Sequence, residues 1–563
     1  MKRNSGLSQR FFSGATAKRR AGFAAGAIFT ALWWTLVFCA PFWRELWTGV
    51  KLGAMSTEAH VAASAVLGSA FLLLSVAIIA LLALLPQKLF KAVMIVLAGL
   101  GATGFAAAVL YNTVMTPDMM RSFLESDPAE ASGYLSLRTI VLWLAVFVPP
   151  VAAALLMHTR PVDIGGIEPS GFAVRRPKCV LALVALVTFA AAAAIVFLNF
   201  QTCASVMRGD RQIRYRIAPF NIVYSSIRTV TKDESPDGKR VRAVIDPAPK
   251  QTVKPERPVV FVVAIGETMR SANWGLSGYA RDTSPELRSL NVINFPRVES
   301  CGTSTDVSLP CMMSRIGREN YDRERILSEE SLPDVLQRAG MNVLWIDNQS
   351  GCKGACAGVP HRKPQAAPEL CGVAGCQDGA VRADVGEIVK DLKPGRPTVL
   401  FLHMIGQHGP AYYKRSPASF KIWKPECEDA DLASCSRESI LNAYDNSVRY
   451  TDSVLAGIIR DMEASGADAG LIYVSDHGES LGENGIYLHG APFMIAPDEQ
   501  KHVPMVLWLS KGFEEDYGVD EALLRERAQK DDHVTHDSLY HTVLGLLKVQ
   551  SSTYQKRLDL SAK

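Results

Sequence analysis

Residues 258–268 read PVVFVVAIGET, an uncharged apolar run that ends in a glycine, a carboxylate and a hydroxyl. Similar apolar runs, with helical patterns between them, occur at 342–346 (NVLWI), 398–405 (TVLFLHMI) and 471–474 (LIYV). Continuous apolar strands that alternate with helices are typical of a mainly parallel sheet covered by helices on both faces. We therefore expect an α/β domain over residues 258–563.

Polar side chains follow each of these strands, at the sheet edge where parallel α/β proteins bind their ligands. They are Glu267 and Thr268; Asp347, Asn348, Gln349 and Lys353; Gln407 and His408; and Ser475, Asp476, His477, Glu479 and, further on, His489. One such residue alone is more often a solvated loop residue. The convergence of carboxylates, imidazoles and an amine favours a site for a metal and a phosphate.

Glu267, Asp476 and His477 offer the oxygen and nitrogen ligands that zinc accepts, and a tetrahedral site then lacks one ligand. The segment 301–317, CGTSTDVSLPCMMSRIG, places hydroxyls before a predicted short helix. The N-terminus of a helix favours phosphate oxygens, and zinc lowers the pKa of a bound hydroxyl. A hydroxyl there is a candidate nucleophile; the alternative is that Thr303–Thr305 only caps the helix.

The first 200 residues contain five apolar stretches, and about 20 apolar residues suffice to span a bilayer. The stretches are 22–42, which is expected to be an uncleaved anchor, 61–85, 90–111, 138–157 and 179–199. Basic residues precede the first stretch, occupy the second loop and precede the fifth stretch, and such segments stay cytoplasmic. An odd number of spans then places everything after residue 200 outside the cytoplasm.

Eight of the 11 cysteines lie beyond residue 300 as close pairs: Cys301/Cys311, Cys352/Cys356, Cys371/Cys376 and Cys427/Cys435. Paired cysteines outside a membrane indicate disulfides in an oxidising compartment, which agrees with the predicted topology. A zinc site built from the four cysteines between residues 352 and 376 is the alternative.

Three parts are expected: a transmembrane domain at 1–200, membrane-surface segments and a linker at 201–257, and the α/β domain at 258–563. Thr116-Pro117-Asp118, in the external loop at 112–137, is typical of a helix start. The net charge of +4 excludes a dense basic face for nucleic acid.

Four longer segments carry a resemblance to a known family: ESCGTSTDVSLPC (299–311), QHGPAYY (407–413), LNAYDN (441–446) and SDHGESLGENGIYLHGAP (475–492). They resemble the lipid A phosphoethanolamine transferases, which include the mobile colistin-resistance enzymes. This family lies within the alkaline phosphatase and sulfatase superfamily. The resemblance extends from the five spans to the end of the chain.

The resemblance implies that Thr305 is the nucleophile and that zinc is held by Glu267, Thr305, Asp476 and His477. It implies one tight zinc site, with a second, transient zinc as a further option. Asp306 follows the nucleophile where alanine is usual in the family, and Gln349 stands where asparagine is frequent.

Other residues match family positions that bind substrate. Lys353, His408, Glu479 and His489 match positions that bind phosphate, assist the leaving group or hold the second zinc. Ser122, Ser126 and Glu130 match positions that meet the lipid headgroup, although family members carry larger or branched polar groups at the first two. These differences from the family leave the chemistry intact, but they bear on which acceptor the enzyme prefers.

The implied reaction moves phosphoethanolamine from phosphatidylethanolamine, through a covalent Thr305 intermediate, to a lipid A-type acceptor of lipopolysaccharide. It lowers the negative charge of the envelope and therefore polymyxin binding. The implied enzyme is a monomeric, multi-pass protein of the bacterial inner membrane, with a cytoplasmic N-terminus and a periplasmic catalytic domain. Core sugars or another envelope glycan are alternative acceptors.

Three rival classes remain. Gly478-Glu479-Ser480-Leu481-Gly482 matches the nucleophile elbow of a lipid esterase, but that elbow needs a helix directly after the serine. A sulfatase would use a modified cysteine, and Cys311 lacks the proline expected two residues later. A membrane sensor without catalysis would have no use for Glu267, Asp476 and His477 on adjacent strand ends.

Overall fold

The structure is a computed structural model of the chain. It describes residues 23–48, 56–125, 136–157, 177–209, 213–232, 242–372, 375–429, 432–530 and 533–563. The chain forms two compact units. The first contains residues up to Met120 together with Leu137–Arg228, and the second contains Arg121–Ser136 together with Thr229–Lys563.

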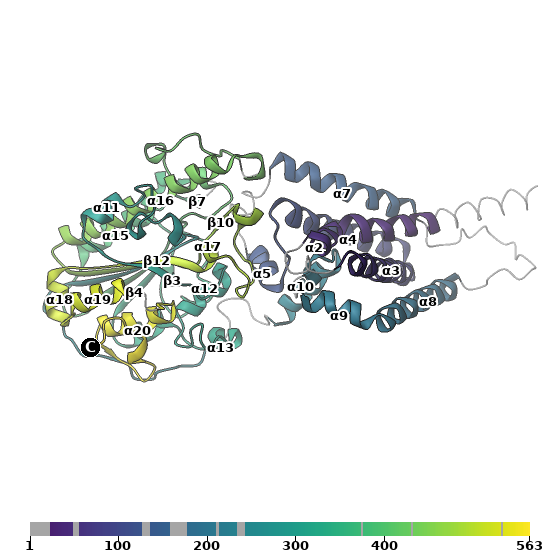
Figure 1. The fold of residues 1–563 in the computed structure, drawn as a ribbon. Coiled ribbons are helices and arrows are strands. Elements are labelled where there is room, and N and C mark those ends of the chain that lie inside the picture. The colour runs from purple at the N-terminus through teal and green to yellow at the C-terminus, as the bar shows by residue number, and fades with distance from the viewer. Residues whose placement is uncertain are drawn as a thin grey trace, which may run out of the picture. The chain divides into compact units, whose positions relative to one another are not determined.

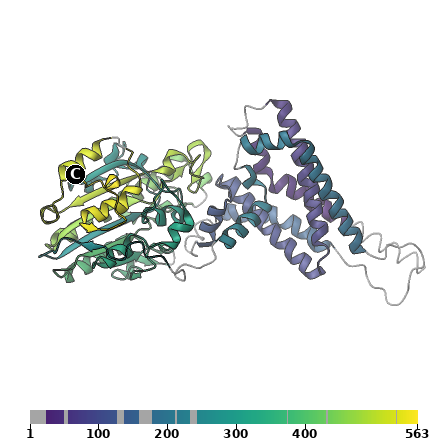
Figure 2. The same ribbon diagram turned by 90° about the horizontal axis from the view of Figure 1, so that it is seen from below.

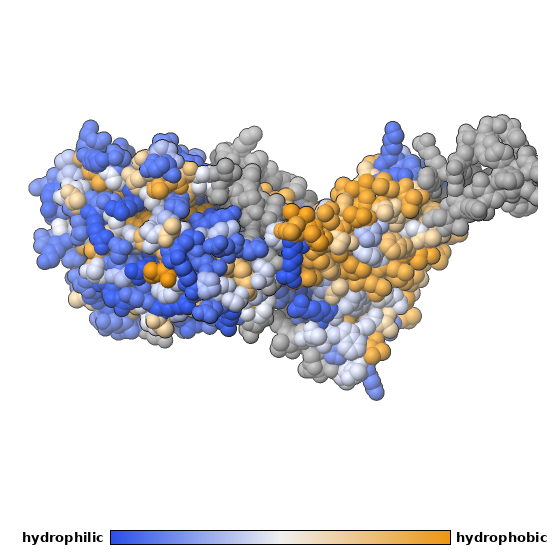
Figure 3. All heavy atoms as spheres, turned by 90° about the horizontal axis from the view of Figure 1, so that it is seen from above, coloured by the Kyte–Doolittle hydropathy of each residue, from blue (hydrophilic) through white to orange (hydrophobic). Residues whose placement is uncertain are grey.

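The first unit is built of apolar helices, and hydrophobic residues gather over it in Figure 3. Its long helices are α3 (Thr57–Leu82), α4 (Gln87–Leu110), α7 (Leu137–Leu156) and α8 (Pro177–Leu198), followed by α9 (Phe200–Gly209), η2 (Ile213–Arg216) and α10 (Phe220–Lys232). At the N-terminus, the helix Phe23–Phe38, whose segment η1 (Trp33–Phe38) is a π-helix, is bent by 43° against α2 (Ala40–Thr48).

Four of these helices are long and apolar enough to cross a membrane, and a fifth crossing results if the bent pair is one span. The four correspond to the predicted spans at 61–85, 90–111, 138–157 and 179–199. The predicted first span, 22–42, is the bent pair, because its helix changes direction at Cys39. The expected five-helix bundle is therefore supported for four helices.

Apolar side chains also fill the interior of this unit. Trp34, Phe38, Phe90 and Met94 belong to one buried cluster. A Cβ atom at Gly101 would lie 2.1 Å from the Phe38 ring, so only glycine lets α4 approach η1 this closely.

The second unit is an α/β fold around a seven-stranded sheet with the order β3-β12-β9-β2-β8-β4-β5. The strands are β2 (Val259–Gly266), β3 (Ile293–Glu299), β4 (Asn342–Asp347), β5 (His361–Arg362), β8 (Thr398–His403), β9 (Asp468–Ser475) and β12 (His502–Leu509). Pairings from β9 across to β5 are parallel. β12 runs antiparallel to both β9 and β3. The sheet is thus mixed, but six of its seven strands run in the same direction, so it is mainly parallel as predicted.

Helices cover both faces of this sheet (Figures 1 and 2). One group contains α11 (Pro285–Ser289), α15 (Gly379–Ile388) and α16 (Arg437–Ala464); the other contains α18 (Lys511–Tyr517), α19 (Glu521–Gln529) and α20 (Asp537–Leu546). α14 (Leu332–Arg338) and α16 lie between predicted strands, where the sequence shows helical patterns. Every residue of β2 and β9 is buried, as expected for strands covered on both faces.

All four predicted disulfides are present, joining Cys301–Cys311, Cys352–Cys356, Cys371–Cys376 and Cys427–Cys435. The alternative zinc site built from four of these cysteines is wrong, because their sulfurs are bonded in pairs. Cys371 and Cys376 also pair across a two-stranded ribbon of β6 (Cys371–Gly372) and β7 (Gly375–Cys376).

Residues 242–257, expected to be part of a linker, contact the α/β unit. β1 (Lys250–Gln251) pairs with β13 (Val549–Gln550), near the end of the chain. Arg242 forms an ion pair with Asp334 at 2.7 Å. These residues therefore contribute to the stability of the α/β unit.

Candidate metal and nucleophile site

The site lies where β2 and β9 end. The two strands are adjacent and parallel, with Gly266 opposite Ser475. The residues that follow them, Glu267 on one side and Asp476-His477 on the other, therefore come together. Each of the three is buried.

The three side chains form a compact cluster. One ligand atom from each lies within 4.8 Å of the others. His477 Nε2 is 3.4 Å from Glu267 Oε1 and 3.5 Å from Asp476 Oδ2. These distances leave room for one small cation between two carboxylates and an imidazole.

Unsatisfied oxygens at the same place support a cation. Glu267 Oε1 and Asp476 Oδ2 are buried, and neither accepts a hydrogen bond from a described residue. Burying a charged oxygen without a partner is costly, and a metal ion removes that cost. The donor set of two oxygens and one nitrogen fits zinc.

The charged groups of the cluster shift one another's pKa values. Burial would raise the pKa of Glu267, but the nearby imidazole of His477 and its charge hold that pKa well below its usual range. Burial and the Glu267 carboxylate raise the pKa of Asp476 to about 6. Burial would lower the pKa of His477, but the two carboxylates outweigh it and raise that pKa to about 10. A metal that binds His477 Nε2 therefore displaces a proton.

Thr305 supplies a hydroxyl to this cluster. It is the first residue of α12 (Thr305–Met312), and Ser304 is the N-cap. Thr305 Oγ1 donates a hydrogen bond to Glu267 Oε2 at 3.0 Å and lies 3.4 Å from His477 Nε2. The hydroxyl thus sits at the N-terminus of a helix, where backbone N–H groups stabilise negative charge.

The turn before Thr305 is held from several sides. The Cys301–Cys311 disulfide closes it. Thr303 Oγ1 donates to the carbonyl of Ala491, and Gly490 N donates to the carbonyl of Thr303. His536 also holds this turn. Its Nδ1 accepts a hydrogen bond from Cys301 N, and its Nε2 donates one to the Ser475 carbonyl. Thr303, the other candidate in this turn, is therefore engaged away from the cluster.

A second group of side chains borders the metal cluster. His489 Nδ1 lies 3.4 Å from Glu479 Oε1, and Glu479 is fully buried. The ring centroid of His489 is 4.5 Å from that of His477 and 6.0 Å from that of His408. The structure thus brings His408, Glu479 and His489 together beside the metal ligands.

Lys353 lies in the loop after β4, with a left-handed backbone (φ 50°). Its Nζ donates to Ser350 Oγ at 3.2 Å. Its role in binding phosphate stays a prediction.

Three residues of the site were not predicted as functional. Gln349, placed at the predicted sheet edge but given no role, donates from Nε2 to Glu267 Oε2 and to the Met404 carbonyl, both at 3.1 Å. His403 Nδ1 lies 3.2 Å from Asp347 Oδ2 inside the sheet. His403 ends β8 within an apolar run, and that run hid it.

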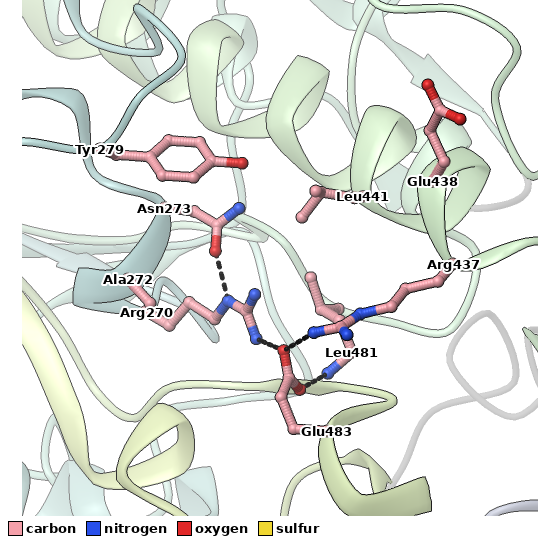
Figure 4. A pocket seen from close by; sticks show the side chains of 9 residues that line it. All are labelled: Arg270, Ala272, Asn273, Tyr279, Arg437, Glu438, Leu441, Leu481 and Glu483. Carbon is pink, nitrogen blue, oxygen red and sulfur yellow. Dashed lines mark hydrogen bonds and ion pairs between the residues drawn. The ribbon is translucent and has the colours of Figure 1, made fainter.

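Arg270 is the third missed residue, and its position three residues after Glu267 was the available signal. Figure 4 shows its guanidinium between Asn273 and Glu483, at the wall of a pocket of about 510 Å³. It donates to Asn273 Oδ1, to Glu483 Oε1 at 2.9 Å and to the Glu479 carbonyl at 3.2 Å. Arg270 therefore holds the backbone that carries Glu479.

The three residues expected to meet the lipid headgroup are only partly placed. Ser122 belongs to α5 (Pro117–Glu125), but its side chain is outside the described part of the structure, and Ser126 and Glu130 lie outside the described residues. The start of α5 is confirmed, since Thr116 Oγ1 accepts from Met119 N at 3.1 Å.

The geometry removes two rivals. Ser480 lies in β10 (Ser480–Leu481), which pairs with β11 (Tyr487–Leu488), so no helix follows it as an esterase elbow requires. Cys311 is bonded to Cys301 and cannot serve as a modified sulfatase cysteine.

Comparison with known proteins agrees with this picture. A family described as sulfatase matches residues 259–549, and one described as phosphoethanolamine transferase EptA/EptB matches residues 71–233. The chain is 37% identical to the phosphoethanolamine transferase EptA of Salmonella typhimurium, over 82% of this chain and 83% of that protein. It is 32% identical to the phosphatidylethanolamine transferase Mcr-1 of Escherichia coli, over 84% and 86%.

A solved structure is similar over almost the whole length. It is the integral membrane lipooligosaccharide phosphoethanolamine transferase A (EptA) from Neisseria meningitidis. The TM-score is 0.85 at 32% identity, with 95% of this chain and 98% of that chain covered.

Proposed function

Because this chain belongs to the EptA/EptB phosphoethanolamine transferase family, we propose that it moves phosphoethanolamine from phosphatidylethanolamine to a lipid A-type acceptor. The observation that carries the proposal is the position of Thr305. Its hydroxyl lies at a helix N-terminus and 3.0 Å from a buried carboxylate of a metal-type cluster. A membrane sensor would not need this arrangement.

We assign zinc to Glu267, Asp476, His477 and Thr305, one tight site with four protein ligands. The unsatisfied oxygens of Glu267 and Asp476 support this assignment. Zinc at this place lowers the pKa of a hydroxyl and neutralises phosphate charge. A second, transient ion at Glu479, His489 and His408 is a further proposal, supported by the short distances among them.

In the first half-reaction, a bond forms between Thr305 Oγ1 and phosphorus, and the bond between phosphorus and the glycerol oxygen of the donor breaks. The Thr305 hydroxyl proton passes to solvent as the bond forms, and diacylglycerol leaves with a proton, which we assign to the His408–His489 pair. In the second half-reaction, an acceptor oxygen attacks the same phosphorus and Thr305 is released. The helix N-terminus and Lys353 balance the phosphate charge, since phosphoryl transfer depends mainly on positioning and electrostatics.

The proposed location is the bacterial inner membrane, with the α/β unit in the periplasm. The apolar helices and the four disulfides of the α/β unit support this location. Phosphoethanolamine on lipid A adds an amine and masks negative charge, so polymyxin binding falls.

Mass spectrometry of envelope lipids tests the proposal. A strain that expresses the chain should gain phosphoethanolamine on lipid A, and the same strain with Thr305→Ala should not. If only core sugars are modified, the acceptor is a core sugar, which is the alternative acceptor named above. Unchanged lipids in both strains, with the protein present in the membrane, would contradict the proposed function.

A further inference from the structure

The segment LNAYDN (441–446) lies in α16 and contains none of the reacting groups. Tyr444 and Asp445, two neighbouring residues of this segment, are nevertheless fully buried. Buried polar side chains are stable only where they have hydrogen-bond partners. The partners of both residues lie in the segment that follows Glu267.

The Tyr444 hydroxyl bridges two backbone groups of the turn after Glu267. It donates to the Thr268 carbonyl at 2.7 Å and accepts from Arg270 N at 3.1 Å. One side chain of α16 thus fixes the backbone on both sides of Met269.

Asp445 holds the continuation of the same segment. Its carboxylate accepts from Asn273 Nδ2 and, at 2.8 Å, from the Tyr279 hydroxyl. Figure 4 shows Asn273 and Tyr279 around the same pocket as Arg270. The segment from residue 268 to residue 279 is therefore held along its length by α16.

Thr268 has a backbone conformation that its own side chain disfavours. Its φ is 55°, in the left-handed region, where a β-branched residue is an outlier. Such conformations persist only where the surrounding structure holds them. The two hydrogen bonds of Tyr444 hold the Thr268 carbonyl and the amide two residues later, so they hold this conformation.

The strained turn directs a backbone amide at a metal ligand. Thr268 N donates to Asp476 Oδ1 at 3.3 Å, and His477 N donates to the same oxygen at 2.7 Å. Asp476 Oδ1 therefore has two amide donors, whereas the buried Oδ2 has no donor among the described residues. The amides orient the carboxylate so that Oδ2 is left for a cation.

We propose that Tyr444 is a positioning residue of the metal site. Its hydroxyl holds the strained turn 267–270, and this turn sets Glu267 and Asp476 relative to each other. The turn can do so because Thr268 directly follows Glu267 and its amide contacts Asp476. The inference rests on the proposed function, because it assumes that zinc binds to these two carboxylates.

The test measures the zinc affinity of the purified full-length enzyme in detergent micelles, by competition with a chelator. Tyr444→Phe removes only the hydroxyl and should weaken zinc binding at least about tenfold, as expected for a residue that orients a metal ligand. The matched control is Tyr540→Phe. It removes an equally buried hydroxyl that bonds to Thr553 Oγ1. This control should keep its zinc affinity, and thermal midpoints check that both variants fold.

A second change tests whether Tyr444 acts through the strained turn. Glycine adopts a positive φ without a steric cost, so Tyr444→Phe/Thr268→Gly should bind zinc more tightly than Tyr444→Phe. Alanine keeps the Cβ atom and therefore the strain. Tyr444→Phe/Thr268→Ala should not recover zinc affinity, although it lacks the same Thr268 hydroxyl.

Unchanged zinc affinity in Tyr444→Phe would overturn the inference. Equal losses in Tyr444→Phe and Tyr540→Phe would also overturn it, because the hydroxyl would then serve stability alone. Equal affinities of the glycine and alanine double variants would exclude the route through Thr268 and overturn it as well. If the unaltered enzyme binds no zinc, the zinc assignment fails and the inference fails with it. A zinc-bound enzyme that transfers no phosphoethanolamine would contradict only the proposed reaction.

Discussion

The two units of the molecule differ in where many of their apolar side chains lie: at the surface in the first unit and in the interior in the second. In α8, Leu186, Phe189 and Phe197 are exposed, whereas in β2 and β9 every residue is buried. The two units therefore need different surroundings. Helices with exposed apolar side chains are stable in lipid, and a unit whose apolar sheet is buried is stable in water. A lipid-modifying enzyme needs both surroundings, because its substrate lies in one and its charged chemistry in the other.

The largest effect should come from the α/β unit. Thr305→Ala removes the nucleophile, so both lipid transfer and soluble phosphodiester hydrolysis should fall by at least about a thousandfold. The loss of one hydroxyl at a helix start costs only about 1 kcal/mol of stability, so folding should persist. Rates and thermal midpoint of the purified enzyme check both points. Thr303→Ala, which loses only the bond to the Ala491 carbonyl, is the matched control. Turnover by Thr305→Ala would contradict the mechanism.

Removing the helical unit should separate binding of the lipid from chemistry. A chain that begins at Arg242 should keep zinc and slow soluble hydrolysis, but lose lipid transfer by at least about a hundredfold, since positioning contributes several kcal/mol. A chain that begins at Arg257 should be less stable, because it lacks β1 and the Arg242–Asp334 pair. Zinc content, thermal midpoints and both rates are the measurements. Lipid transfer equal to that of the full chain would show that the helical unit only anchors the enzyme.

Two disulfides with similar loop lengths should differ in their effect on activity. Cys301–Cys311 and Cys427–Cys435 have sequence separations of 10 and 8, so each should contribute about 2–3 kcal/mol. Replacing both cysteines of the first pair by serine should also lower hydrolysis about tenfold, because that pair closes the turn before Thr305. The second pair should change stability alone. Equal activity losses, measured at a temperature where both variants are folded, would assign the effect to stability.

A change at Glu130, one of the three residues expected to meet the lipid headgroup, should have a smaller effect on activity. Glu130→Ala should lower lipid transfer about fivefold without changing soluble hydrolysis, because the loss of one carboxylate–ammonium pair in water costs up to about 1 kcal/mol. Initial rates with mixed donor and acceptor lipids provide the measurement, and a donor with a choline headgroup is the control. Equal transfer by Glu130→Ala and unaltered enzyme would remove this residue from the site.

The smallest effect on activity should come from a buried histidine of the α/β unit, because its change acts on stability in acid and not on the reacting groups. Burial, with a further contribution from His477, lowers the pKa of His536 to about 3. Below pH 6.5 the unfolded chain binds a proton at this residue and the folded chain does not until about pH 3. Stability should therefore fall as pH falls through that window, by up to about 1.4 kcal/mol per unit. Thermal midpoints against pH should flatten in His536→Gln but not in the exposed control His361→Gln. Parallel profiles of all three proteins would contradict the assignment.

Much of the sheet was predictable because its central strands are long apolar runs that end in polar residues. β2 and β9 gave both the strand and the site, since Glu267, Asp476 and His477 directly follow them. β12, with the apolar run HVPMVLWL, could have been recognised as a strand, but no functional residue follows it. β3 contains a proline and polar residues, so its sequence resembles an irregular segment. β12 and β3 were not predicted for these reasons.

The parts of the site that escaped prediction depend on contacts between distant segments. Gln349 lies 82 residues from Glu267, and Arg121 lies 185 residues from Asp306. No periodicity or spacing joins such pairs, because folding alone brings them together. Asp306 was visible in the sequence only as a departure from a family pattern, and its ion pairs with Arg121 and Arg323 were not visible there.

The position of the Cys301–Cys311 disulfide also bears on when the enzyme matures. Both cysteines are fully buried, and their bond closes the stretch 301–311 that contains Thr305. A newly made chain carries free thiols until its α/β unit has crossed the membrane. Under the proposed topology, we expect activity to appear only after export and oxidation, so a strain without a periplasmic thiol oxidase should insert the full chain yet modify few lipids.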